Sequence, residues 1–229
     1  SREKEMVRLG SGSTDMKGGN VIMPFASKAL KAAGQLERMS ITVVLNGDEE
    51  EPGEPIALAR QALTEAGARS RIAIGVEDGD GDPRTAVAAR RGFTGWTLRV
   101  RGTPAHASQV FREDIGPGAI YEAARILEAF RTQLGGDPLR TFNAGVAAGG
   151  TDVSLDSTAT RGTAFGKSNV IPEHFVVTGD LRVISPAALS DAKARMQAIV
   201  AQSTRGTSAT IVFDDGYPPM APSPGNLAL

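Results

Sequence analysis

The residues best suited to chemistry begin with a run of acidic side chains that follows a short apolar segment. Four consecutive carboxylates occupy positions 48–51, directly after Asn46-Gly47 and the apolar residues 41–45. The apolar residues are mostly β-branched, which is typical of a strand buried on both faces. Ligands often bind at the carboxyl ends of strands in open α/β sheets. Because adjacent carboxylates repel one another unless a cation is present, the run predicts a cation site. The alternative is a solvated acidic loop.

Two further carboxylates stand at comparable positions. Asp15 lies at the start of a predicted helix, in Thr14-Asp15-Met16-Lys17-Gly18-Gly19-Asn20, and Glu77 follows the apolar segment 72–76. If both apolar segments are strands of one sheet, Asp15, Glu50 and Glu77 meet at the same edge and form an oxygen-rich cation site. Taken alone, Asp15 is explained equally well as a helix N-cap.

Histidine is scarce, which bears on any metal site. The chain contains two histidines, His106 and His174, and both lie far along the sequence from the carboxylates. Catalytic zinc normally binds imidazole as well as carboxylate. The first half of the chain therefore offers oxygen ligands only.

The elements that would position these carboxylates follow an α/β pattern. Residues 16–33 carry apolar side chains at helical spacing and are followed by Gly34, a typical C-terminal stop. Residues 54–66 predict a second helix, and residues 41–45 and 72–76 predict buried strands. The order strand, helix, strand indicates an α/β domain with a largely parallel sheet.

The second half predicts a β-α-β-β-α-β unit. Its expected strands are 96–101, 141–147, 175–184 and 208–213, and its expected helices are 117–134 and 186–201. This order is the split βαβ, or ferredoxin-like, arrangement with two helices on one face of an antiparallel sheet. A longer connection rich in Gly, Thr, Ser and Asp, residues 149–173, separates the second and third strands.

Three segments follow from these patterns. Residues 1–92 are expected to be part of an α/β domain, and residues 93–215 an inserted α/β domain. Residues 216–229, which are rich in proline, are expected to be a linker that returns to the first domain.

Composition narrows the functional classes. Hydrophobic residues make up 41% and charged residues 22%, and the net charge is −1. These values are ordinary for a soluble protein, and they favour neither nucleic acid nor a membrane as partner. The absence of cysteine excludes disulfides and thiolate catalysis in this chain. The compartment stays open between the cytoplasm and the periplasm.

The combination of motifs is similar to one family. Asp15-Met16-Lys17-Gly18-Gly19, then Asp48-Glu49-Glu50, then Glu77 after an apolar segment resembles the di-zinc peptidases and deacylases, which include glutamate carboxypeptidase, acetylornithine deacetylase and succinyl-diaminopimelate desuccinylase. The resemblance implies a partial catalytic α/β domain with an inserted ferredoxin-like lid, or dimerisation, domain. It implies two zinc ions, bridged by Asp15 and bound by Glu50 and Glu77, and Glu49 as the general base.

The lid motifs carry further implied roles. Gly102-Thr103-Pro104-Ala105-His106-Ala107-Ser108 resembles a loop whose histidine contacts substrate, so His106 is expected to donate to the oxyanion of the intermediate. Asn169 and Arg182 lie in two other lid-like motifs and are expected to hold the substrate's carboxylate. For Arg182 the alternative is a strand-surface residue paired with Asp180. His174 matches no motif of the family.

The resemblance also implies that parts are missing. The family's two zinc-binding histidines would precede Ser1 and follow Leu229, so the chain is expected to be a fragment lacking both ends. We expect the 229-residue chain alone to be inactive and to hold zinc weakly or not at all.

For the full-length protein, the resemblance implies a homodimeric hydrolase. Its substrate would be a small peptide or N-acyl amino acid, cleaved at an amide next to a free carboxylate. Two alternatives stay open: an aminopeptidase of the same clan, or a non-catalytic dimerisation or binding module with a vestigial metal site.

Overall fold

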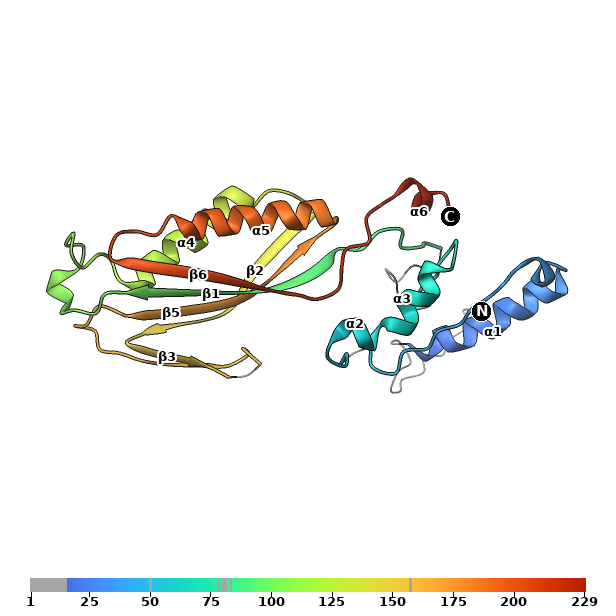
Figure 1. Ribbon diagram of the computed structural model, residues 1–229, viewed down its shortest axis with the longest axis horizontal. Coiled ribbons are helices and arrows are strands. Elements are labelled where there is room, and N and C mark those ends of the chain that lie inside the picture. The colour runs from blue at the N-terminus through green and yellow to red at the C-terminus, as the bar shows by residue number, and fades with distance from the viewer. Residues whose placement is uncertain (1–15, 50, 78, 80–81, 83, 157) are drawn as a thin grey trace, which may run out of the picture. The chain divides into compact units, whose positions relative to one another are not determined.

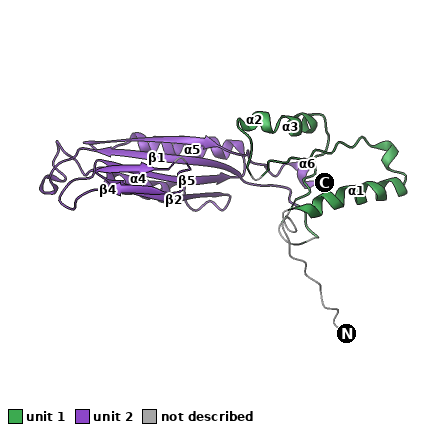
Figure 2. Ribbon diagram, turned by 90° about the horizontal axis from the view of Figure 1, so that it is seen from below, with its two compact units in different colours: residues 1–86 green, residues 87–229 purple. Residues whose placement is uncertain are grey.

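The computed structural model describes residues 16–49, 51–77, 79, 82, 84–156 and 158–229. The chain forms two compact units, residues 1–86 and 87–229, which Figure 2 colours separately. Each unit has its own elements and is treated by itself below as unit 1 and unit 2.

The described part of unit 1 is helical. It contains α1 (Lys17–Ala32), the 3₁₀ turn η1 (Leu36–Arg38), α2 (Ile56–Ala59) and α3 (Gln61–Ala68). The predicted helix over 16–33 is confirmed, and the helix predicted over 54–66 is present as two pieces. Gly34 adopts φ +67°, Gly34 N donates to the Lys31 carbonyl and Gln35 N to the Leu30 carbonyl. These bonds form a Schellman motif, which explains why α1 stops at the glycine.

The two strands predicted in unit 1 are wrong for this structure. Residues 41–45 and 72–76 are not in strands, and most of their apolar side chains are exposed, with Leu45 at 68% and Ile74 at 79%. A strand requires a hydrogen-bonding neighbour, and no strand lies among the described residues of unit 1. Both segments are apolar as the prediction requires, but the described residues of unit 1 include no strand that could pair with them.

Unit 2 is built on a four-stranded antiparallel sheet in the order β2-β5-β1-β6. Its strands are β1 (Gly92–Gly102), β2 (Arg140–Gly150), β5 (His174–Val183) and β6 (Thr207–Asp215). The helices α4 (Ala119–Leu134) and α5 (Pro186–Ala201) connect β1 to β2 and β5 to β6. This is the predicted β-α-β-β-α-β order, and Figure 1 shows both helices along one side of the sheet.

The hydrophobic core of unit 2 lies between those helices and the sheet. Alternate residues of β1, Trp96, Leu98 and Val100, are at most 2% exposed and face α4 and α5. The Trp96 ring packs edge-on against Phe130 of α4 with 6.0 Å between centroids. Because α4 and α5 cover this face of the sheet, other contacts with the sheet are made on the opposite face.

A short hairpin occupies the connection between β2 and β5. The sequence predicts only an irregular connection over 149–173, whereas the structure contains β3 (Asp152–Leu155) and β4 (Gly162–Phe165), paired antiparallel. The Ala159 carbonyl accepts a hydrogen bond from Thr178 Oγ1 of β5. Thr178 pairs with Thr97, which points away from the core, so the hairpin lies against the face of the sheet opposite the helices.

The remaining elements are a 3₁₀ turn, η2 (Ala107–Gln109), and a short C-terminal helix, α6 (Pro224–Leu227). The predicted linker over 216–229 runs back beside the start of β1. Arg90 and Met220 exchange backbone hydrogen bonds of 2.9 Å, and Phe93 N donates to the Tyr217 carbonyl at 3.0 Å. These residues belong to unit 2.

Among the helices that the structure describes, none combines the length and hydrophobicity that a membrane span needs.

Candidate functional site

The acidic loop of unit 1 is anchored by an arginine that sequence analysis missed. Arg60, whose side chain is 8% exposed, donates from Nη1 to Asp48 Oδ1 at 2.7 Å and from Nη2 to the Asp48 carbonyl at 2.8 Å. Gly53 N donates to the other carboxylate oxygen at 3.1 Å. The Gly53 amide and the Arg60 guanidinium hold the pKa of Asp48 below its ordinary value. Asp48 therefore serves to position the loop, and its neighbour Glu49 points to solvent as an exposed side chain.

A glycine brings the start of α1 against the residue before Glu77. Gly19 is buried, and a Cβ at this position would overlap the Val76 carbonyl oxygen. Gly19, the second glycine of the sequence motif, therefore has a packing role, because only glycine permits this approach. The first turn of α1 consequently lies against Val76, the residue that precedes Glu77.

Two of the four carboxylates predicted for the metal site lie among the described residues. Asp15 and Glu50 lie outside the described residues, whereas Glu49 and Glu77 are described and exposed. Carboxylate oxygens suit a divalent cation, so the donor chemistry of this set fits a metal ion. Among the described residues, however, no three side chains of His, Cys, Asp or Glu gather in one place.

The candidate histidine of unit 2 is exposed and held in one orientation. His106 Nδ1 accepts a hydrogen bond of 3.2 Å from the backbone N of Ser108 and lies 2.9 Å from the Ser108 hydroxyl. An amide N–H can only donate, so Nδ1 of the neutral ring is unprotonated and the proton is on Nε2. His106 thus presents a donor to solvent, which suits contact with an oxyanion. A place in the core of its own unit would have contradicted this role.

Asn169 lies beside His106. The loops that carry them are joined by backbone hydrogen bonds of 2.9 Å from Ala107 N to the Asn169 carbonyl and from Ile171 N to the Ala105 carbonyl. The Asn169 side chain is exposed. Two of the three lid candidates are therefore together.

Arg182 lies at the other end of β5. It pairs with Phe93 at the start of β1, whereas His174, which immediately follows the Asn169 loop, pairs with Arg101 near the end of β1. Positions 174 and 182 are eight residue steps apart along the strand, about 26 Å at about 3.3 Å per residue. Arg182 Nε donates to Asp180 Oδ2 at 2.7 Å, and the guanidinium lies 5.8 Å from the Phe93 ring centre. Within one chain, Arg182 does not meet Asn169.

The fold has solved relatives. Aminopeptidase PepT from Bacillus cereus matches with a TM-score of 0.57 and 20% identity, over 95% of this chain and 55% of that one. A tripeptidase from Staphylococcus aureus matches with a TM-score of 0.45 and 18% identity, over 62% and 34%. An aminobenzoyl-glutamate utilization protein from Klebsiella pneumoniae matches with a TM-score of 0.44 and 21% identity, over 64% and 35%.

The matched structures are much longer than this chain. The chain spans about a third of the Staphylococcus tripeptidase and of the Klebsiella protein, and about half of the Bacillus aminopeptidase. No curated protein matches the sequence. At this identity, the Bacillus structure supports the fold alone.

A family model supplies the assignment. The model of the peptidase dimerisation domain of M20 peptidases matches residues 88–207. That region contains β1, α4, β2, β5 and α5 and ends at the first residue of β6, and it makes up more than half of the 229 residues. The predicted ferredoxin-like dimerisation domain is thus confirmed, and the chain belongs to the M20 peptidase dimerisation-domain family.

Proposed function

We propose that the full-length protein is a metal-dependent hydrolase that cleaves an amide bond next to a free carboxylate. One observation carries the proposal. A peptidase dimerisation domain follows, in the same chain, a unit whose acidic loop is anchored at Asp48 by the buried Arg60. Asp48 anchors the loop, whereas its neighbour Glu49 is exposed.

Each carboxylate has a proposed role. Asp15, Glu50 and Glu77 would ligate two zinc ions, which lower the pKa of a bound water and polarise the amide carbonyl when present. Glu49 would accept the proton of the attacking water and pass it to the leaving nitrogen. His106 would donate from Nε2 to the oxyanion that forms on the carbonyl oxygen.

The separation of Arg182 from Asn169 supports a site shared by two copies. If both side chains hold one substrate, they come from different chains, because the two ends of β5 are too far apart to meet within one chain. We propose that His106 and Asn169 of one copy complete the site to which the second copy contributes Arg182. Twofold dimers are the commonest way for a domain of this kind to cover an open sheet edge.

The direct test is turnover by the full-length zinc-loaded protein. The substrate panel should contain N-acyl amino acids together with dipeptides and tripeptides, because the similar folds include an aminopeptidase and a tripeptidase. Glu49→Gln should lower turnover by about 100-fold or more and leave bound zinc unchanged. Glu51→Gln, an exposed neighbour, is the matched control and should leave turnover intact. Full activity of Glu49→Gln would remove the general base from the proposal, and no turnover on the whole panel would favour a binding module.

Mixed dimers test the shared site. His106→Ala and Arg182→Ala should each be inactive. Random re-association of the two should restore about a quarter of the sites, since half the dimers are mixed and each has one intact site. No recovery after verified exchange of subunits would place His106 and Arg182 in the same chain's site.

A further inference from the structure

Strand register gathers basic and hydroxyl side chains on one face of the unit 2 sheet. Arg99 and Arg101 alternate along β1 with the core residues Leu98 and Val100, so both point away from α4 and α5. In the antiparallel register, Arg101 lies between His174 of β5 and Ser208 of β6. This row therefore presents a guanidinium, an imidazole and a hydroxyl side by side.

The next row continues the pattern. Arg99 lies between Val176 of β5 and Thr210 of β6. Val176 is only 4% exposed, although it faces away from the core. Because β3 packs against β5 on this face, the hairpin supplies the cover.

The two rows line a hollow of about 240 Å³ whose wall includes Val153 of β3. Its floor consists of the outward-facing residues of three adjacent strands. Pockets for drug-sized ligands usually measure about 300–1,000 Å³, so this hollow suits a smaller molecule.

The hollow carries an excess of positive charge. Arg101 Nη2 donates to Glu173 Oε1 at 2.8 Å, and His174 Nε2 lies 3.5 Å from the same oxygen. The Arg101 guanidinium holds the pKa of Glu173 below its ordinary value, so Glu173 is ionised and neutralises one cation. Arg99 has no ion-pair partner among the described residues. Its charge, and the hydroxyls of Ser208 and Thr210, face the hollow without a carboxylate beside them.

We propose that this hollow is a binding site for a small oxyanion, either a carboxylate or a phosphate group. Arg99 and Arg101 would bind the anion, and His174 would lie beside it. The planar fork of arginine matches both groups and forms charge-assisted hydrogen bonds with them. None of its lining residues is assigned a role in amide hydrolysis above. The site is therefore independent of the proposed function, and an experiment can disprove either one without affecting the other.

The test is a titration of the 229-residue chain at constant ionic strength, with inorganic phosphate in one arm and glutarate in the other. Chemical shifts of the backbone amides of β1, β5 and β6 report binding. Saturable shifts centred on residues 99–101, 174 and 208–210 are expected in at least one arm, and the arm that responds identifies phosphate or carboxylate as the source of the anion. Saturation in neither arm would overturn the site.

Three variants make the result specific to this hollow. Arg99→Gln should weaken binding by about tenfold or more, because a charge-assisted contact is lost. Glu173→Gln should tighten binding, since it removes the carboxylate that competes for Arg101. Arg131→Gln, at an exposed ion pair on α4 across the sheet, is the matched control and should change nothing. Unchanged affinity in Arg99→Gln, or an equal loss in Arg131→Gln, would overturn the site.

Discussion

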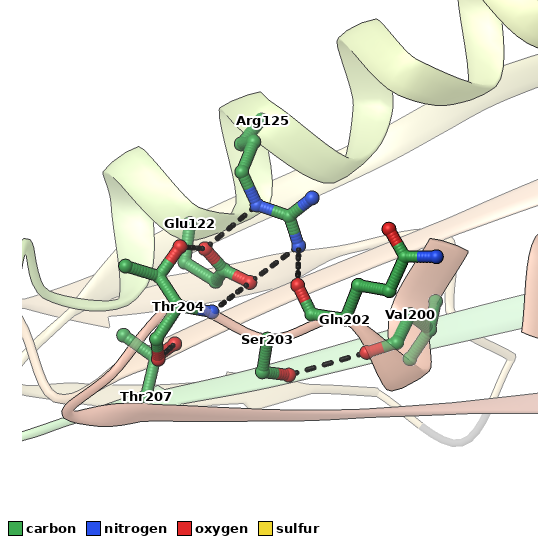
Figure 3. Close-up of polar contacts among 7 residues, drawn as sticks. All are labelled: Glu122, Arg125, Val200, Gln202, Ser203, Thr204 and Thr207. Carbon is green, nitrogen blue, oxygen red and sulfur yellow. Dashed lines mark hydrogen bonds and ion pairs between the residues drawn. The ribbon is translucent and has the colours of Figure 1, made fainter. Parts of the chain in front are cut away.

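Thr204 Oγ1 donates a hydrogen bond of 2.6 Å to Glu122, a carboxylate of α4 that is completely buried. The Thr204 backbone N donates to the other carboxylate oxygen at 3.1 Å, and Arg125 binds both oxygens from Nε and Nη2. Arg125 also donates to the Gln202 carbonyl at 2.8 Å. Figure 3 shows how these bonds join α4 to the turn between α5 and β6. Every oxygen of the buried acid is thereby paired, which is the condition for keeping a charge inside the fold.

Removing this buried acid should destabilise unit 2. Glu122→Ala leaves the Thr204 donors without their acceptor, whereas Arg125, which is 37% exposed, stays in contact with water. Loss of a buried hydrogen-bond partner costs about 1–3 kcal/mol. The measurement is urea unfolding followed by the fluorescence of Trp96. Glu128→Ala is the matched control, because Glu128 lies on the same helix, pairs with Arg131 in the same spacing and is exposed. Equal midpoints for the two variants would contradict the role given to Glu122.

The same group predicts an acid-dependent loss of stability. Burial alone would raise the pKa of Glu122, but the hydrogen bonds from Arg125 and Thr204 outweigh it and hold the pKa below the ordinary value of 4.5. A lowered folded-state pKa stabilises the fold above the unfolded-state pKa, and this stabilisation is lost as pH falls through the folded-state value. The difference in unfolding free energy between wild type and Glu122→Gln should therefore be constant near neutral pH and shrink below about pH 4.5. A difference that grows on acidification would show the opposite sign of shift.

Unit 1 should unfold at a lower free energy than unit 2. Fifteen of the buried apolar residues form one core cluster in unit 2, whereas Ala66 is the one buried apolar residue among those described in unit 1. Regions with few buried contacts open at low free energy. Brief trypsin digestion of the 229-residue chain should cut first between residues 17 and 91 and leave a fragment beginning at residue 85, 91 or 92, identified by mass spectrometry. First cuts within β1 or β5 would reverse this order of stability.

The close approach at Gly19 gives a test of the proposed metal site. Gly19→Ala forces α1 away from the Val76 carbonyl and so displaces the start of the helix from Glu77. In the full-length protein, displacing a catalytic group by about 1 Å can lower turnover by about 100-fold. Gly18→Ala adds the same methyl group where the nearest atom is the Met16 side chain at 3.6 Å. Wild-type turnover and zinc content in Gly19→Ala would remove the link between α1 and Glu77 from the mechanism.

We predict that the full-length protein dimerises through the sheet of unit 2. β2 and β6 are the outer strands of the four-stranded sheet, and Val212 on β6 is 64% exposed. Sedimentation of the full-length protein should show a dimer, because an open edge favours pairing with its own copy. A monomer at all accessible concentrations would exclude both the dimer and the shared site.

Local patterns predicted the parts that depend on neighbours in sequence. The period of apolar residues predicted α1, and Gly34 predicted its end. Strand alternation and helical spacing predicted the order of the lid. Prediction failed at residues 41–45 and 72–76, because a strand is made by its partner and no partner strand is among the described residues of unit 1.

By itself, the sequence determined the family resemblance, the β-α-β-β-α-β order and the identity of the candidate residues, since each is carried by residue types at short spacing. Only the tertiary structure decided that Arg60 anchors Asp48, that His106 lies beside Asn169 and that Arg182 lies at the other end of β5. It also decided that Arg99, Arg101 and His174 share one face with the β3–β4 hairpin. The physical reason is that these relationships depend on strand register and on contacts between segments far apart in the chain, and a local pattern specifies neither.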